Sequence, residues 1–333
     1  MTTKPALSLL TFCLSAAAAL PVLAQAPQAP QPPAAPDAPA APAAPAGPGA
    51  LDVFDTARHT VRSTAEWLAR SVDSWFGDRP FDQGGKVTDG RLDLNFLHRR
   101  DTGNDFSLRF NARFRLPNVE QQTYLFLGRD DQRDVVADTP AAFTRQDRLQ
   151  SERRSDRAFF AGLGYDWREN VDFRLGLRGG LKPYAQARYR QRWAMGARGF
   201  VEFRETLFWS LADRVGSTTA LSYERSLSPT LALRWLNAAT ITQRTKEFDW
   251  SSDLALVKDF GHARQGSVEA VIDGTTGSGV PVREWGLQTR WQQPLHRSWL
   301  HGELTVGRIW ARPDAATPRE GVWALGLGMK MRF

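Results

Sequence analysis

The chain has 333 residues, of which 42% are hydrophobic, and its mean hydropathy is −0.42. After the N-terminal region there is no run of about 18 apolar residues, so the sequence excludes a helical membrane protein. The formal net charge of +7 would suit nucleic acid, but the export signal described next argues against it. Anionic lipid, polyanionic sugars and small anions are the partners that we expect instead.

Residues 1–24 have the pattern of a secretory signal peptide. Lys4 precedes an apolar run over 7–20, and cleavage is expected after Ala24. The one cysteine, Cys13, lies inside this run without the small neighbour that a lipoprotein acceptor needs. We therefore expect a mature chain without cysteine, and so without a disulfide or a thiolate metal site.

Residues 25–50 consist almost entirely of alanine and proline, with nine prolines between Pro27 and Pro48. Such a segment cannot bury a core and is expected to be extended, in the manner of polyproline. At about 3.1 Å per residue it would span roughly 80 Å. Two roles stay open: a periplasmic spacer towards peptidoglycan or a partner, and an unstructured tail.

Residues 51–77 predict an amphipathic helix that Gly77 ends. Its large apolar side chains recur at helical spacing and fall on one stripe: Phe54, Val61, Leu68, Val72 and Trp75. Such a helix could plug a pore, lie on a membrane leaflet, bind a periplasmic partner or pack on the rim of a barrel. The sequence leaves these roles open.

From residue 91 the chain becomes a series of short alternating runs separated by turn residues. In the clearest run, 106–116, one face is apolar and the other carries Arg109, Arg113 and Arg115, which suits lipid outside and water inside. Fourteen strands are predicted, with twelve as the alternative because 91–97 and 217–225 are weak. The predicted strands are 91–97, 106–116, 121–128, 157–167, 171–179, 183–193, 199–211, 217–225, 229–242, 247–260, 264–273, 282–292, 298–311 and 321–333.

The connections between these strands alternate in length. With a periplasmic N-terminus, every second connection should be a short periplasmic turn, and those at 117–120, 168–170 and 261–263 are short. The other set contains the longest connection, 129–156, which is a mixed run of acidic and basic residues. In a barrel this stretch could fold inward and narrow the pore. Alternatively, Asp130, Asp131 and Asp134 could bridge lipopolysaccharide through divalent ions.

The last strand has one large apolar face that reaches the final residue: Trp323, Leu325, Leu327, Met329, Met331 and Phe333. It resembles the closing strand of Gram-negative outer-membrane β-barrel, porin-like proteins, which ends in Phe or Trp and is read by the barrel-assembly machinery. The resemblance implies an all-β fold, a transmembrane antiparallel up-and-down β-barrel over 91–333. It also implies an outer-membrane location and contact with lipopolysaccharide. The 12 Trp and 19 Phe would suit two aromatic girdles.

The phase opposite the apolar one is rich in arginine. The candidate lumen and anion-binding residues are Arg109, Arg113, Arg115, Arg174, Arg178, Arg188, Arg190 and Arg192. Guanidinium groups stay charged and match carboxylate and phosphate, so rows of them along a pore would favour small anions or acidic sugars. This wall chemistry is similar to that of arginine-lined porins for acidic oligosaccharides. The alternative is that Arg–Asp and Arg–Glu pairs fill a narrow barrel, with five inward acids as partners: Asp93, Asp172, Glu202, Glu284 and Glu303.

Three functional classes follow from these patterns. The first is a channel with an arginine-lined, anion-preferring lumen. The second is a plugged structural or tethering barrel whose helix 51–76 binds a periplasmic partner or the rim. The third, an outer-membrane enzyme, lacks a recognisable catalytic set, because only His98 among the five histidines is expected near the outer rim. No phosphate loop, zinc spacing or calcium loop occurs, so no cofactor is predicted.

Overall fold

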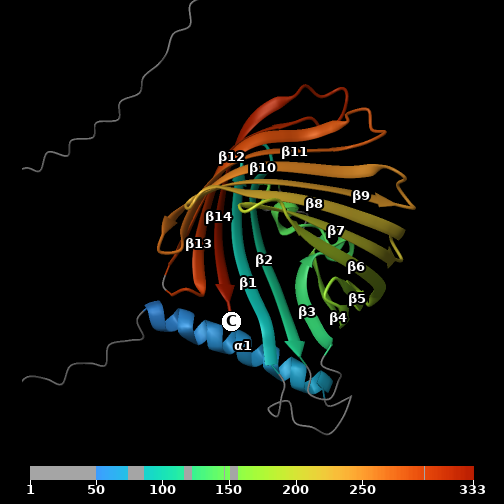
Figure 1. The fold of residues 1–333 in the computed structure, drawn as a ribbon, viewed down its shortest axis with the longest axis vertical. Helices are drawn as coiled ribbons and strands as arrows, with labels where there is room; N and C mark the ends of the chain where they lie inside the picture. Colours follow the sequence, from blue (N-terminus) through green and yellow to red (C-terminus); the bar gives the residue numbers. More distant parts are fainter. Residues whose placement is uncertain (1–49, 74–85, 116–121, 146, 151–156, 296) are drawn as a thin grey trace, which may run out of the picture. The chain divides into compact units, whose positions relative to one another are not determined.

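The computed structural model describes residues 50–73, 86–115, 122–145, 147–150, 157–295 and 297–333. The predicted signal peptide, the Pro/Ala-rich segment up to residue 49 and the predicted helix stop at Gly77 lie outside these residues. Within the described residues, fourteen antiparallel strands form one closed barrel, in which β1 pairs with β14 (Figure 1). Every other pairing joins strands that follow one another in the sequence. The prediction of a fourteen-stranded, up-and-down β-barrel is therefore confirmed.

The strand bounds agree with the alternating runs of the sequence. The two weak runs belong to full strands, and β1 starts at Lys86 because a bulge between Val87 and Asp89 continues its pairing with β2. The strands are β1 (Lys86–Arg99), β2 (Gly103–Arg115), β3 (Thr123–Asp131), β4 (Arg157–Arg168), β5 (Val171–Arg178), β6 (Lys182–Ala194), β7 (Gly199–Ser210), β8 (Arg214–Ser228), β9 (Leu231–Thr242), β10 (Phe248–Gly261), β11 (Arg264–Thr275), β12 (Val282–Pro294), β13 (Leu300–Ala311) and β14 (Glu320–Arg332).

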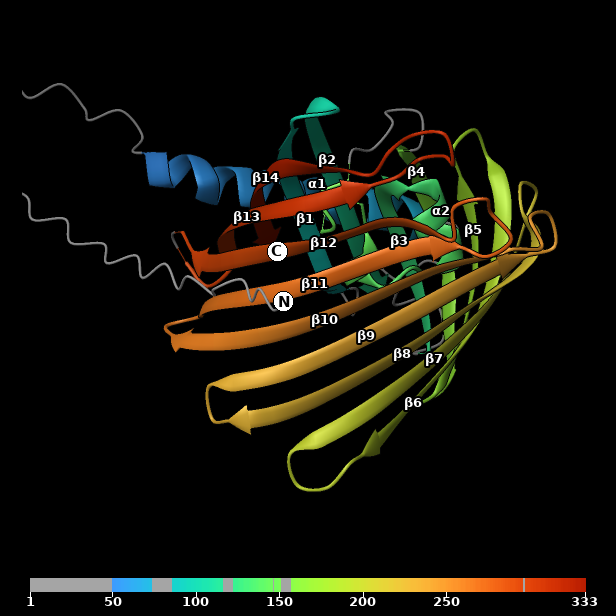
Figure 2. The ribbon, with the colours of Figure 1, turned by 90° about the horizontal axis from the view of Figure 1, so that it is seen from above.

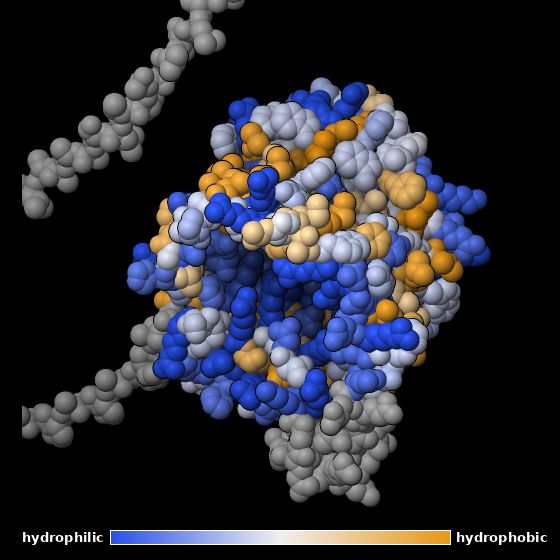
Figure 3. Space-filling model, in the orientation of Figure 1, coloured by the Kyte–Doolittle hydropathy of each residue, from blue (hydrophilic) through white to orange (hydrophobic). Residues whose placement is uncertain are grey.

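The polarity of the two faces of the sheet is the reverse of that in a soluble protein: the outer face is apolar and the inner face is polar. In β5, Leu175 is 67% exposed on the outer face, whereas Arg178 is only 5% exposed on the inner face. Because side chains alternate along a strand, the same division holds around the barrel. The space-filling view shows a hollow lined by hydrophilic side chains (Figure 3). Large exposed apolar side chains on the outside are typical of a barrel surrounded by lipid.

The two ends of the barrel differ in their connections. At one end, here called the short-turn end, strands are joined by short turns such as that between β10 and β11. At the other, the long-loop end, the segment between β3 and β4 is the longest connection and contains helix α2 (Gln132–Ala137) and the 3-10 turn η2 (Ala141–Phe143). The predicted alternation of connection lengths is therefore present.

Helix α1 (Ala50–Asp73) precedes the barrel and contacts its outer face at the short-turn end. Phe54 packs against Trp299, Leu300 and Met331, and the side chain of Arg58 donates a hydrogen bond of 3.3 Å to the carbonyl of Arg332. In a second contact, Ala65 is buried with the apolar residues Ala112, Phe114 and Leu125. The helix thus contacts the rim from outside and leaves the lumen free. No helix among the described residues is both long and apolar enough to cross a membrane.

Candidate functional site

The lumen is crossed by the segment that connects β3 to β4. Residues 132–145 and 147–150, here called the inward loop, leave the end of β3 and turn into the barrel. Helix α2 contacts β3, β6, β7 and β8, and Val136 and Ala137 are buried in a cluster with Tyr124, Phe160 and Tyr184. The side-chain amide of Gln186 donates hydrogen bonds of 2.7 Å to the carbonyls of Val135 and Val136. Apolar packing and backbone hydrogen bonds therefore hold the first half of the loop against the wall.

Asp138 forms the first charged anchor of the inward loop. It ends α2 in the left-handed region, with φ of 52°, and points its carboxylate at three arginines of the wall. The ion-pair distances are 3.2 Å to Arg188, 3.5 Å to Arg204 and 3.9 Å to Arg174. Thr206 also donates a hydrogen bond of 3.1 Å. Burial alone would raise the pKa of Asp138, but the three arginines outweigh burial and hold that pKa below its usual range.

Asp147 forms the second anchor on the opposite side of the lumen. Its carboxylate lies 2.6 Å from the Arg290 guanidinium and 3.9 Å from the Lys330 ammonium. The side chains of Gln288 and Arg290 also donate hydrogen bonds of 2.8 Å to its backbone carbonyl. Burial favours the protonated form, but these cations lower the pKa of Asp147. The loop therefore spans the lumen from β6 and β7 to β12.

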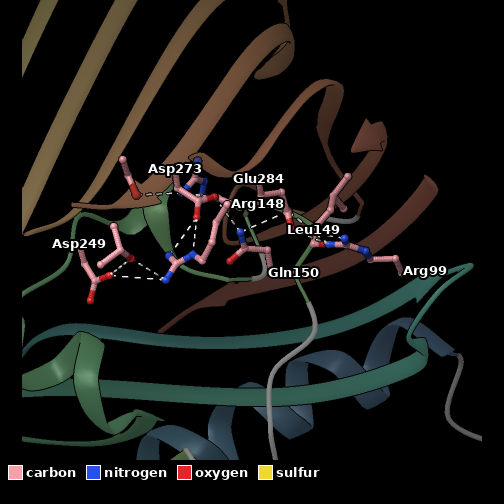
Figure 4. A network of polar contacts seen from close by, with 10 residues as sticks. Arg99, Arg148, Leu149, Gln150, Asp249, Asp273 and Glu284 are labelled. Carbon is pink, nitrogen blue, oxygen red and sulfur yellow. Dashed lines mark hydrogen bonds and ion pairs between the residues drawn. The ribbon is translucent and has the colours of Figure 1, made fainter. Parts of the chain in front are cut away.

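A third anchor follows directly along the chain. The Arg148 guanidinium lies 3.2 Å from Asp273 and donates a hydrogen bond of 2.9 Å to Ser251. Gln150 reaches Asp273 and Glu284 at 3.1 and 3.3 Å (Figure 4). Burial lowers the pKa of Arg148, and the carboxylates around it oppose this effect. Here the loop carries the cation and the wall carries the acids, which is the reverse of the first two anchors.

Leu149 adds apolar packing to this third anchor of the inward loop. It is buried with Leu97 and Ala324, and its carbonyl accepts a hydrogen bond of 3.3 Å from Arg99. Its side chain fits because two wall residues are glycine: a Cβ added at Gly307 or Gly326 would lie 2.8 or 2.9 Å from a Leu149 methyl group. The small residues of β13 and β14 therefore admit the loop.

The inward loop leaves two cavities beside it. One, of about 310 Å³, is lined by loop residues together with Arg109, Arg113 and Arg174. The other, of about 570 Å³, is lined by loop residues together with Arg178, Arg244 and Arg283. Both cavities also contain aspartates, so the walls are polar and of mixed charge. The loop thus narrows the lumen without filling it.

The structure places all eight predicted arginines on the lumen-facing phase of their strands. Five of them contact carboxylates: Arg109 with Asp130, Arg113 with Asp166, Arg174 and Arg188 with Asp138 and Asp172, and Arg178 with Asp213.

The other three, Arg115, Arg190 and Arg192, are exposed near the short-turn end. Arg192 stacks on Phe200, with its guanidinium carbon 3.5 Å from the ring centroid. None of the three forms an ion pair with another described residue. Arg190 stands directly opposite Arg204 in the register of β6 and β7. Of the eight predicted arginines, the three that are exposed to water therefore lie in the lumen half nearest the short-turn end, where Arg192 stands directly opposite Glu202.

His98 and Asp130, two other residues that the sequence analysis considered, contact neighbouring side chains. His98 lies 2.7 Å from Asn104 at the long-loop end. Asp130 turns into the lumen towards Arg109. Across the part of the chain that the structure describes, no group of three or more His, Cys, Asp or Glu residues could hold a metal ion.

Sequence reasoning missed Asp138 and Asp147 as partners of the wall arginines. Both lie in the mixed-charge connection that was expected to be either an inward or a surface loop. One signal was present: apolar residues such as Val135, Val136 and Phe143 interrupt the charges, and apolar residues in a long loop indicate burial.

No family model and no curated protein matches the chain in sequence. Solved outer-membrane proteins resemble it in fold. The channel DcaP of Acinetobacter baumannii has a TM-score of 0.44 at 8% identity, over 75% of this chain and 98% of that chain. OccK11 of Pseudomonas aeruginosa has a TM-score of 0.41 at 11% identity, over 75% and 96%. OmpT of Vibrio cholerae has a TM-score of 0.39 at 9% identity, over 75% and 98%. Likenesses this weak carry no argument about the function of this chain.

Proposed function

We propose that this protein is an outer-membrane channel that prefers anions and is narrowed by its inward loop. The observation that carries the proposal is the pair of polar cavities beside the loop, inside a closed barrel with an apolar outer face. Small anions, including acidic sugars, are the solutes that such a lumen would favour.

The three exposed arginines supply the anion preference in this proposal. Arg115, Arg190 and Arg192 lie in the half of the lumen that leads to the short-turn end, which would be the periplasmic end. A charge in water acts over a Debye length of about 8 Å at physiological ionic strength. The paired arginines deeper inside contribute less net potential, because Asp138 and Asp172 offset them.

A plugged barrel is the second candidate, and the three anchors of the inward loop favour it. Ion pairs and hydrogen bonds join the loop to β6, β7, β11 and β12. A loop fixed on both sides of the lumen resists displacement by a passing solute. Under this alternative, the contact of α1 with the rim would be the functional feature.

Planar-bilayer recording separates the two candidates. The channel should give single-channel currents whose reversal potential in a salt gradient favours chloride over potassium. The double variant Arg190→Gln with Arg192→Gln should reduce that preference and keep the barrel folded. Lys258→Gln with Arg264→Gln is the matched control, because it also removes two positive charges, from exposed residues on the outer phase of β10 and β11. A purified protein that inserts without conducting would support the plugged barrel.

A further inference from the structure

The outer face of the barrel carries a polar patch where apolar side chains are expected. Its members belong to four strands that lie side by side, β7 to β10 (Figure 2). We define the polar patch by five residues: Glu205, Ser217, Thr219, Asn237 and Ser252. Their outward direction follows from alternation, because the flanking Arg204 and Thr206 point inward to Asp138.

The register of the strands places these residues in two neighbouring groups. Glu205 is directly opposite Thr219, and Asn237 is directly opposite Ser252. The carboxylate of Glu205 accepts a hydrogen bond of 2.7 Å from the Thr219 hydroxyl and a second one from the Ser217 hydroxyl. The Ser252 hydroxyl accepts a hydrogen bond of 3.1 Å from the indole of Trp235. The patch therefore comprises two neighbouring polar groups on the outside of the barrel, one on β7 and β8 and one on β9 and β10, with Asn237 directly opposite Leu221 of β8.

The polar patch lies within the apolar belt and not at its rim. Towards the long-loop end it is followed by the exposed side chains of Trp209 and Val215. Towards the short-turn end it is followed by those of Leu221, Leu254 and Leu256. Lipid around the barrel would therefore contact the polar patch at the depth of the hydrocarbon tails.

Hydrocarbon offers no partner for these groups. A carboxylate has about four acceptor positions, and the hydroxyls of Ser217 and Thr219 occupy two of those of Glu205. The side-chain amide of Asn237 makes no hydrogen bond to any residue that the structure describes. Ionisable side chains at membrane depth almost always face protein or water. The patch is therefore built for contact with another polar surface.

We infer that the polar patch is the contact surface between two copies of this chain in the membrane, which rests on the membrane placement proposed above. The patch holds acceptors on β7, at Glu205, and an amide donor on β9, at Asn237, with β8 between them. A two-fold axis beside β8 brings β7 of one copy against β9 of the other, so carboxylate meets amide twice. Such self-complementarity is what a symmetric dimer requires. A second copy also presents its apolar belt at the same depth.

Disulfide cross-linking in isolated outer membranes tests this inference on the full chain. In a Cys13→Ser background, Leu221→Cys places a thiol on β8 beside the polar patch, and Leu304→Cys places a matched thiol on β13. The two positions are similarly exposed, at 43% and 40%. After mild oxidation, Leu221→Cys should give a band of twice the monomer mass, and Leu304→Cys should give little. Fractionation and the heat-modifiable gel shift of each variant establish that it is membrane-inserted and folded, which tests the placement separately.

A second change tests the role of the patch itself. Adding Glu205→Leu or, separately, Asn237→Ala to Leu221→Cys should lower the cross-linked fraction about fivefold, as expected for loss of interfacial hydrogen bonds. Two variants are used because one of them could reduce folding. Equal cross-linking of Leu221→Cys and Leu304→Cys would overturn the inference. So would a cross-linked product of any other mass, which would indicate a different protein partner, or cross-linking that neither patch substitution reduces.

Discussion

The carboxylate of Asp138 lies 3.2 Å from the guanidinium of Arg188, and both groups are largely shielded from solvent. This pair joins a loop that enters from β3 to the far wall of the barrel at β6. It also neutralises, at mid-lumen, an arginine that the sequence predicts to attract anions. The inward loop therefore sets both the width of the lumen and its charge.

We predict that Asp138→Asn widens the channel. The substitution keeps the shape and removes the charge that faces Arg188, Arg204 and Arg174, and breaking a buried ion pair costs about 3–5 kcal/mol. Single-channel conductance should rise, and the reversal potential should shift further towards chloride because the arginines lose their counter-charge. Asp314→Asn, at an exposed position between β13 and β14, is the control. A lower conductance in the Asp138 variant would contradict this role of the loop.

Leu149→Ala should weaken the packing of the inward loop against β13 and β14. Removing a buried leucine side chain costs about 2–5 kcal/mol, and the two facing glycines cannot fill the space. Thermal unfolding in detergent should occur at a lower temperature, and open-channel current noise should increase. The matched change Leu211→Ala, at an exposed apolar position, should leave the noise as it is. If both variants behave alike, Leu149 does not hold the loop.

Asp134 in α2 should make the packing of the loop depend on pH. Its burial, together with the neighbouring charges of Asp131 and Asp130, raises its pKa to about 7, while Arg109 opposes the increase. In an unfolded chain the pKa of an aspartate is about 3.9. Because the packed loop binds the proton more tightly, its stability falls as pH rises from about 4 to about 7. Above that range Asp134 is charged, and the packed loop is at its least stable.

The measurement is conductance at pH 5 and at pH 8. The wild-type protein should conduct more at pH 8, and Asp134→Asn should remove most of the difference because the amide does not ionise. The pairs made by Asp138 and Asp147 should persist over this range, since their lowered pKa values keep both groups charged. An unchanged pH response in Asp134→Asn would rule out this residue as the source.

Deletion of Phe333 should slow assembly of the barrel. Its backbone N–H donates a hydrogen bond of 3.0 Å to the carbonyl of Gly90, and its ring stacks on Phe110 at 5.9 Å between centroids. The terminal residue thus helps to close β14 onto β1 and β2. Unboiled gels should show less of the heat-modifiable folded form during a time course. Normal folding of the deletion variant would show that the terminal aromatic is not the assembly signal.

The barrel fold could be predicted from the sequence because the patterns that determine it are local. Alternation in runs such as 106–116 fixes which side chains face the lumen, and turn residues separate one run from the next. Connection lengths then predict which end carries the long loops. Each of these signals lies within one strand or one connection, so a single sequence is enough to read them.

The arrangement inside the lumen could not be predicted in the same way, since it depends on contacts between distant residues. Asp138 pairs with Arg188, and Arg148 pairs with Asp273, across the barrel. No periodic pattern in the sequence relates residues that are so far apart in the chain. The sequence left the position of α1 open, with packing on the barrel rim among the alternatives, because Ala65, 1% exposed against the barrel, is too small to mark an apolar stripe. The sequence therefore predicts where arginines point but not which of them are neutralised.

The reversal potential of single channels in a salt gradient tests the central claim most directly. The account predicts currents that prefer chloride in the wild-type protein, and a smaller preference when Arg190 and Arg192 are both changed to Gln. Potassium preference in the wild-type protein, or insertion without any conductance, would contradict an anion-preferring channel.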